Sequence, residues 1–455
     1  EPFDDVPFLW KNFSSRKYLT YFSEEWKECT FNNLKFGFRE NPTDYYFRSY
    51  WMALYNSTSY ARTSLNSNSK PCYYNKLLHE LSLDWLKSFE KFNTDFEEKN
   101  QIKNIPRFGL VKVNEMSHDY LDRLFWIDDD IKNLFMNLFT EKFLNNTMVI
   151  FMGDHGHRFH PIRRNFIGKI EEKLPMFSII LPRKIKNQNK YLRKVFEHNT
   201  KKLTTWWDVY ETLKHVLLDQ INVSDDPNQS EYLKELETRK IDQKGQSLFL
   251  PLSHRSCKQA NIPEYLCSCD LSLDVNLSDP IILKAANFMV DYINNQVLKD
   301  QSKICMELKL SKILDAQIYK NKPEKLSIIF ETLPNNATFD GTILIGKEKS
   351  SEKESNTKND NHTTENFKIL GKIVRINSYG LSSSCVKKYH LKNFCYCFDY
   401  HFKSTKSIST SNPTLNDSLK ASSNNSANVN SILMSQSNSS NVQNQVVKVL
   451  ESNIT

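Results

Sequence analysis

The chain has 455 residues, of which 39% are hydrophobic and 25% are charged, and its formal net charge is +8. This length suffices for two or three domains, or for one large α/β domain with appendages. No apolar run approaches the roughly 18 residues that a transmembrane helix needs, and no signal-peptide pattern is present. Because residue 1 is a glutamate, we expect a processed product or a fragment of a longer protein.

The positive charge is spread along the chain and has no single focus. Its densest basic stretch, residues 183–202, contains few aromatic residues and no nucleic-acid motif. We therefore expect a solvated surface there and no nucleic-acid partner, with a docking patch for an anionic polymer as the alternative.

The aromatic residues of the first part of the chain, 1 to about 72, alternate with polar ones and predict short strands and helices packed by rings. Residues 75–98 carry apolar side chains at helical spacing. Next come a predicted strand at 107–114, a long amphipathic helix at 118–143 and a continuous apolar strand at 147–152. This order predicts a βαβ crossover, with parallel pairing of its two strands in a sheet covered on both faces.

The remaining elements follow the same rules. Residues 174–182 predict another inner strand. Residues 204–220 and 278–296 predict helices, the first capped by Thr204 or Thr205 and the second by Ser278. Beyond about residue 320, strand-like segments alternate with polar turns, the last of them at 394–402.

The change of character along the chain indicates three parts. We expect an N-terminally incomplete α/β domain over 1–300 and a small cysteine-containing β region over 301–403, with a charged loop at 347–366. A Ser/Asn-rich tail over 404–455 is expected to be disordered.

Nine cysteines lie mostly in the second half of the chain. Two Cys-x-Cys pairs, at 267–269 and 395–397, lack the spacing and the histidines of a zinc knuckle. We therefore expect disulfides in an oxidising compartment, with a metal site as the alternative. Asn-x-Ser/Thr sequences favour a secreted or lumenal glycoprotein. The candidate glycosylation sites include Asn12, Asn56, Asn145, Asn222 and Asn336.

Polar residues follow both strands of the predicted crossover. The first strand runs into Asn114 and His118. The second runs into Asp154, His155 and Arg158. Carboxyl ends of parallel strands share one sheet edge, where ligands gather, so a metal centre of carboxylate and imidazole groups is indicated. The alternative is a loop in which Asp154 caps a helix and the histidines and the arginine are surface groups.

The run FMGDHGHRF at 151–159 resembles the Asp-His-Gly metal motif of the alkaline phosphatase and sulfatase superfamily. Other segments between residues 1 and 300 resemble a narrower, largely nematode family within it, whose uncharacterised members are secreted or membrane-anchored. Among these segments are FDDVPFLWKNF, VNEMSHDYLDRLFWIDDDI and GQSLFLPLSHRSC. The resemblance resumes at 376–397. It implies an α/β fold whose mostly parallel sheet is flanked by helices.

The resemblance also implies site roles. Asp154 and His155 would bind a divalent metal, with zinc expected and calcium or manganese as alternatives. His118 would be a further metal ligand or a phosphate-binding group, and Asn114 and Arg158 would contact the substrate. The acidic ligand and the Ser or Thr nucleophile of the superfamily would precede FDDVPFLW, so no catalytic nucleophile is assigned within this chain.

We therefore expect a metal-dependent hydrolase or transferase in the extracellular space or the secretory lumen, acting on phosphate or sulfate esters of small molecules, glycans or lipids. Without the nucleophile segment, the chain as given is expected to be inactive. The alternative is a non-catalytic secreted glycoprotein with a binding or structural role. A membrane anchor is expected only within an upstream segment.

Overall fold

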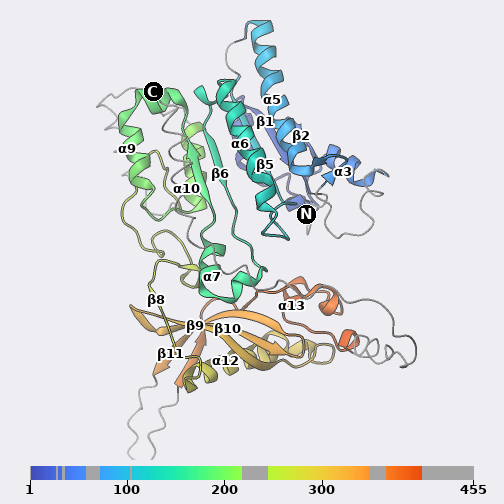
Figure 1. Cartoon of the computed structure of the whole chain (residues 1–455), viewed down its shortest axis with the longest axis vertical. Coiled ribbons are helices and arrows are strands. Elements are labelled where there is room, and N and C mark those ends of the chain that lie inside the picture. Colours follow the sequence, from blue (N-terminus) through green and yellow to red (C-terminus); the bar gives the residue numbers. More distant parts are fainter. Residues whose placement is uncertain are drawn as a thin grey trace, which may run out of the picture. The chain divides into compact units, whose positions relative to one another are not determined.

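The computed structural model describes residues 2–26, 29–32, 36–57, 72–102, 105–217, 244–347 and 365–401 (Figure 1). All of them belong to one compact unit, Glu1–Phe402. The tail expected at 404–455 lies outside the described residues, as does most of the charged loop expected at 347–366. None of the described helices combines the length and the apolar character of a membrane span.

A parallel sheet with the strand order β2–β1–β5, whose strands are labelled in Figure 1, forms the N-terminal part of the structure. Its central strand, β1 (Leu19–Glu24), pairs with β2 (Tyr45–Tyr46) and with β5 (Arg107–Lys112). Stacked aromatic rings cover β1, as the contact between Phe22 and Trp10 shows. The α/β organisation and the packing by rings agree with the prediction, whereas the expected mostly parallel sheet is not found, because parallel pairing among the described residues is limited to these three strands.

The helices expected at 75–98 and 118–143 are present as α5 (Leu78–Asn100) and α6 (Leu124–Thr140). The second starts later than predicted, because turns and bends occupy residues 115–123. The other helices before residue 220 are α1 (Leu9–Ser15), α2 (Cys29–Asn32), α3 (Arg48–Asn56), α7 (Phe166–Lys173), α8 (Arg183–Gln188), α9 (Lys190–Asn199) and α10 (Trp206–Leu217). A small hairpin is formed by β3 (Cys72–Tyr73) and β4 (Lys76–Leu77).

The predicted parallel pairing of the two crossover strands is wrong. The second strand, β6 (Val149–Met152), pairs antiparallel with β7 (Phe177–Ile180), and no described pairing joins it to β5. It is also not buried on both faces, since Met152 is 40% exposed. An apolar run predicts that a strand forms, but it does not specify the strand's partner.

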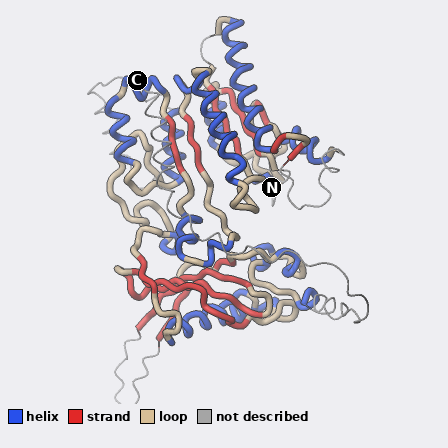
Figure 2. The backbone as a smooth tube through the Cα atoms, viewed as in Figure 1, coloured by secondary structure: helices blue, strands red, loops and turns tan. Residues whose placement is uncertain are grey.

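An antiparallel sheet with the order β12–β11–β10–β9–β8 follows in the chain (Figure 2). The helix α12 (Pro280–Tyr292) packs on it (Figure 1) and contributes Met289 to the largest hydrophobic cluster among the described residues. Asp279, and not the predicted Ser278, caps this helix by accepting a hydrogen bond from the Ile281 N–H. The strands are β8 (Ser272–Asp274), β9 (Lys309–Tyr319), β10 (Lys322–Leu333), β11 (Ala337–Lys347), β12 (Glu365–Ile369) and β13 (Val374–Arg375), which pairs with β11.

Six of the cysteines form disulfides, which confirms the preference for disulfides over a metal. The pairs are Cys257–Cys267, Cys305–Cys395 and Cys385–Cys397. The strand predicted at 394–402 is wrong. Beyond the short helix α13 (Tyr389–Lys392), this segment makes only an isolated bridge between Cys397 and Cys305 and then a helical turn. In this segment the disulfides bury half-cystines and the aromatic residues between them. The resulting sequence pattern resembles that of a strand.

Candidate site at the carboxyl ends of the strands

Lys112 links the ends of two strands that do not pair with each other. It is the last residue of β5, and its Nζ lies 3.5 Å from Oδ2 of Asp154, which follows β6. The same ammonium group donates a hydrogen bond to Thr30 Oγ1 at 2.8 Å. The ends of β5 and β6 therefore lie close to each other, although no described hydrogen-bonded pairing joins the two strands.

Asp154 and His155 lie in the loop that follows β6, and they place a carboxylate close to an imidazole ring. The Nδ1 of His155 lies 2.7 Å from the Gly156 carbonyl oxygen. Because a carbonyl only accepts, Nδ1 carries the proton, and in the neutral ring Nε2 keeps its lone pair. That Nε2 lies 3.9 Å from Asp154 Oδ2.

The carboxyl group of Asp154 is held in its ionised form. Partial burial acts to raise its pKa, but His155 and Lys112 nearby, together with a hydrogen bond from the His155 N–H, lower the pKa below its usual value. An ionised carboxylate beside an imidazole lone pair is a donor set that suits a divalent metal.

Two contacts fix the backbone of this loop. The Gly156 N–H donates to the Glu172 carbonyl at 2.8 Å, and a Cβ on Gly156 would lie only 2.4 Å from the Glu171 carbonyl oxygen. A glycine is thus required by close approach to α7. On the other side, the indole Nε1 of Trp206, at the start of α10, donates to the Asp154 carbonyl at 3.0 Å.

The helix that supports the loop is itself anchored to the antiparallel sheet. Lys169 of α7 donates to Asp340 Oδ1 of β11 at 2.6 Å and to Ser327 Oγ of β10. Arg163 pairs with Asp340 Oδ2 at 3.3 Å and with Glu172 Oε2 at 3.0 Å. Both cations and Asp340 are buried. The sequence gives no sign of this network, because its members lie far apart in the chain.

His118 sits in the turn after β5 with its ring already oriented. Its Nδ1 lies 2.7 Å from Asp119 Oδ1, and this hydrogen bond raises the pKa of His118, whereas burial and the charge of Arg158 act to lower it. The ring contacts Trp26, with 5.4 Å between centroids. Arg158 is exposed, with its guanidinium 5.8 Å from the ring of Phe159.

Asn114 directs its amide inward. Its Nδ2 donates to Glu24 Oε1 at 2.7 Å, while the N–H groups of Asn114 and Glu115 donate to Glu25 Oε1. Glu25 is fully buried, and burial raises its pKa to about 8, so the carboxyl group is protonated at neutral pH. Sequence reasoning missed Glu24 and Glu25, although the segment YFSEEW ends a strand just as the two recognised segments do.

The candidate metal ligands do not form a closed cage. Among the described residues, the groups of three or more potential ligand atoms within 4.8 Å of one another consist of cysteines only. Asp154 and His155 could therefore supply two ligands to a metal, and His118 forms no close group with them. The arrangement fits half of a four-ligand site.

The candidate glycosylation sites differ in access. Asn56, at the end of α3, and Asn336, in the turn between β10 and β11, are exposed. Asn12 and Asn145 are partly buried, and Asn222 lies outside the described residues.

These features define a disulfide-bonded α/β protein with polar groups gathered at strand ends. The chain belongs to the family described as "Protein of unknown function (DUF229)", whose model matches residues 2–314. The match covers the whole strand-end site and reaches into β9. No curated protein and no solved structure matches the chain. The three disulfides indicate an oxidising environment, extracellular or secretory.

Proposed function

We propose that this chain carries the metal-binding part of a hydrolase or transferase of phosphate or sulfate esters, which works in the extracellular space or the secretory lumen. The observation that carries the proposal is the proton position on His155. Its Nδ1–H is bound to the Gly156 carbonyl, so the Nε2 lone pair lies beside the Asp154 carboxylate. Proteins fix metal-binding histidines in this way. The resemblance of FMGDHGHRF to the superfamily motif supports the same assignment.

The cationic groups around this edge suit an anionic ester. Lys112 lies beside Asp154, Arg158 is exposed, and the hydrogen bond to Asp119 favours the charged form of His118. These groups would attract and orient the oxygens of a phosphate or sulfate group. A divalent cation held by Asp154 and His155 would polarise the ester. The described residues supply binding and orientation, and no nucleophile is assigned among them.

A zinc titration of the oxidised, chelator-treated protein tests the metal site. All variants carry Cys72→Ser and Cys269→Ser, because these two exposed free thiols would themselves bind zinc. Asp154→Asn is expected to weaken zinc binding by at least about tenfold, since it removes an anionic ligand. The matched control is Asp129→Asn, which makes the same charge change on an exposed part of α6 and should leave the affinity unchanged. Equal affinities for the two variants would overturn the metal site.

The substrate class has its own test. With zinc bound, inorganic phosphate or sulfate is expected to bind, and Arg158→Ala should weaken this binding while leaving the zinc affinity unchanged. A zinc-loaded protein that binds neither anion would keep the metal site but contradict the assignment to phosphate and sulfate esters.

A second candidate function is a non-catalytic binding or structural glycoprotein. The contact between Lys112 and Asp154 favours it, because the ammonium group balances the carboxylate without a metal. Asn114 also favours this second function, since its amide is hydrogen-bonded to Glu24. Lys112→Met discriminates between the candidates. A metal site should bind zinc more tightly once the competing cation is removed, whereas a purely structural ion pair should yield no zinc binding in either form.

A further inference from the structure

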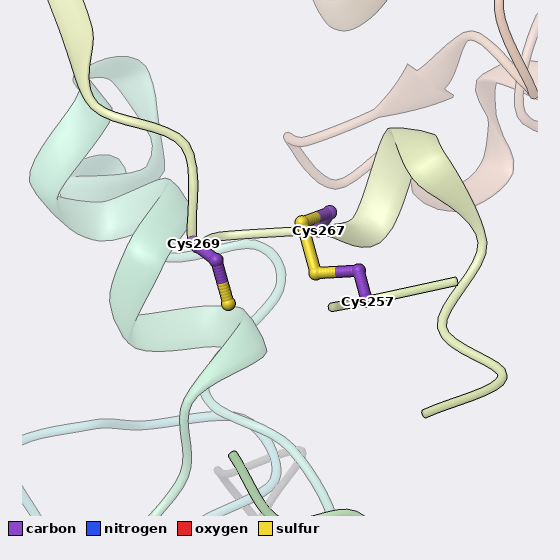
Figure 3. Close-up of side chains that lie close together, drawn as sticks. All are labelled: Cys257, Cys267 and Cys269. Atoms are coloured by element: carbon purple, nitrogen blue, oxygen red, sulfur yellow. A yellow bond between two sulfur atoms is a disulfide. The ribbon is translucent and has the colours of Figure 1, made fainter. Parts of the chain in front are cut away.

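Three cysteines meet where the chain approaches the edge strand β8 (Figure 3). Cys257 and Cys267 form a disulfide, and the Sγ atoms of Cys257, Cys267 and Cys269 all lie within 4.8 Å of one another. Cys269 is a free, exposed cysteine, whereas the half-cystines beside it are buried. We propose that these residues form a thiol–disulfide exchange site, in which Cys269 is the attacking thiol.

The exchange is balanced within the chain. Cys269 loses its proton to solvent, and its Sγ attacks the Sγ of Cys257. A bond forms between Cys269 and Cys257 while the Cys257–Cys267 bond breaks, and Cys267 leaves as a thiolate that takes up a proton. The number of disulfides does not change, so no oxidant or reductant is needed.

Attack at Cys257 is favoured over attack at Cys267. The resulting Cys257–Cys269 disulfide closes a loop only two residues longer than the present one, which has a sequence separation of 10. A Cys267–Cys269 disulfide would instead close a small ring across Ser268, where the geometry that a disulfide needs is hard to reach. The exchange therefore frees Cys267, which is buried in the present structure.

The surroundings of Cys269 keep this reaction slow near neutral pH. Partial burial and the negative charge of Asp270 raise the pKa of the thiol. Lys322 and Lys325 face Asp270, with Nζ to Oδ2 distances of 3.2 and 3.6 Å, and offset part of its charge. Because the thiolate is the nucleophile, the exchange should accelerate as the pH rises toward the pKa of Cys269.

The exchange would change which residue before the antiparallel sheet is covalently bound to Cys257. Residues 267–271 lead into β8, and the Leu271 carbonyl accepts a hydrogen bond from the Lys320 N–H just after β9. Anchoring the chain at Cys269 instead of Cys267 places the covalent attachment two residues closer to this edge strand. The site thus has two covalent forms, which differ in how closely the disulfide restrains β8.

Peptide mapping tests the proposal on the full chain with Cys29→Ser and Cys72→Ser, which remove the cysteines outside the disulfides and this site. The folded protein is held at pH 9 without a labelling reagent, so that the exchange can reach equilibrium. It is then acidified to pH 6 to slow the exchange, unfolded in urea with a maleimide so that the buried Cys267 is also accessible, and digested without reduction. Fragment ions on either side of Ser268 then distinguish label on Cys269 from label on Cys267. We expect about a tenth or more of the label on Cys267, together with a Cys257–Cys269 cross-link, if the two disulfides are within tenfold in stability.

Two controls assign the label. Cys269→Ser should abolish labelling of Cys267, and so should blocking Cys269 with maleimide at pH 6 before the incubation at pH 9. The blocking control uses the natural cysteine, so it stands even if the serine variant folds poorly. Label confined to Cys269 after the incubation at pH 9, or label on Cys267 that persists when Cys269 was blocked beforehand, would overturn the exchange site. Neither result depends on metal binding at Asp154.

Discussion

The antiparallel region and the parallel-sheet region differ in the size of the hydrophobic clusters that they form. In the antiparallel region, one continuous cluster joins α12 to the strands, and Phe330 and Phe339 within it are fully buried. Around the parallel sheet the described clusters are small, and α6 leaves Phe125 83% exposed and Trp126 51% exposed. The strand-end site therefore lies in the less completely buried region, and the tightly packed sheet holds it through α7.

This contrast indicates that the antiparallel region provides most of the stability, whereas the candidate site lies in the other region. A continuous buried cluster gives cooperative stability, whereas segments with few buried contacts open at low cost. Apolar patches that remain exposed are typical of binding surfaces. We therefore expect changes in the antiparallel region to alter folding and changes on the exposed face of α6 to leave it intact.

The largest effect is expected from the long-range disulfide of the antiparallel region. Replacing Cys305 and Cys395 by serine removes a link with a sequence separation of 90 and should lower the free energy of unfolding by about 4 to 5 kcal/mol. The same change at Cys257 and Cys267, with a separation of 10, should cost about 3 kcal/mol. Urea unfolding of the oxidised variants measures both. A larger loss for the shorter loop would contradict the expected dependence on loop length.

The next effect concerns the connection between the regions. Asp340→Ala leaves Lys169 and Arg163 buried without their shared carboxylate, which should cost about 3 to 5 kcal/mol. Asp129→Ala, at a side chain that is 86% exposed, is the control and should change stability by no more than about 0.5 kcal/mol. Similar unfolding midpoints for the two variants would show that the buried network does not join α7 to the sheet.

A pH-dependent effect is expected at Glu25. Its pKa is about 8 in the folded protein and near 4.5 in the unfolded chain, so the folded state holds one more proton between these pH values. Stability should therefore fall by a few kcal/mol as the pH rises from about 4.5 to 8. Glu25→Gln cannot ionise and keeps the acceptor for two backbone N–H groups, so it should flatten this part of the curve. Parallel stability curves for the two proteins would refute the assignment.

The smallest effect is expected on α6. Phe125→Ala should change the free energy of unfolding by no more than about 0.5 kcal/mol, because the ring is exposed. Leu134→Ala, on the buried side of the same helix, should cost about 2 to 5 kcal/mol. Thermal unfolding of the pair checks the comparison, and a large loss at Phe125 would mean that the ring is covered in solution.

Local patterns in the sequence predict local structure in this chain. The apolar spacing of α5 and α6 and the runs that form β6 and β10 are visible by inspection, and so are Asp154 and His155 after a strand. Pairing is not a local property, and the antiparallel partner of β6 was missed for that reason. The ion pair between Lys169 and Asp340, separated by 171 positions, depends on the assembled fold. Glu24 and Glu25 were missed because the pattern over residues 1 to about 72 predicted short strands and helices without indicating which segment forms which.

The hydrogen bond from Trp206 to the Asp154 carbonyl gives the candidate site an optical reporter. An indole is a fluorophore, and its emission responds to the hydrogen bonding and polarity around its N–H group. A ligand that shifts the Asp154 backbone would lengthen or break this bond and change the emission of Trp206. The difference between the spectra of the natural chain and Trp206→Phe isolates that signal from the other six tryptophans, since the chain has seven. Binding at the strand ends can therefore be followed without an attached dye.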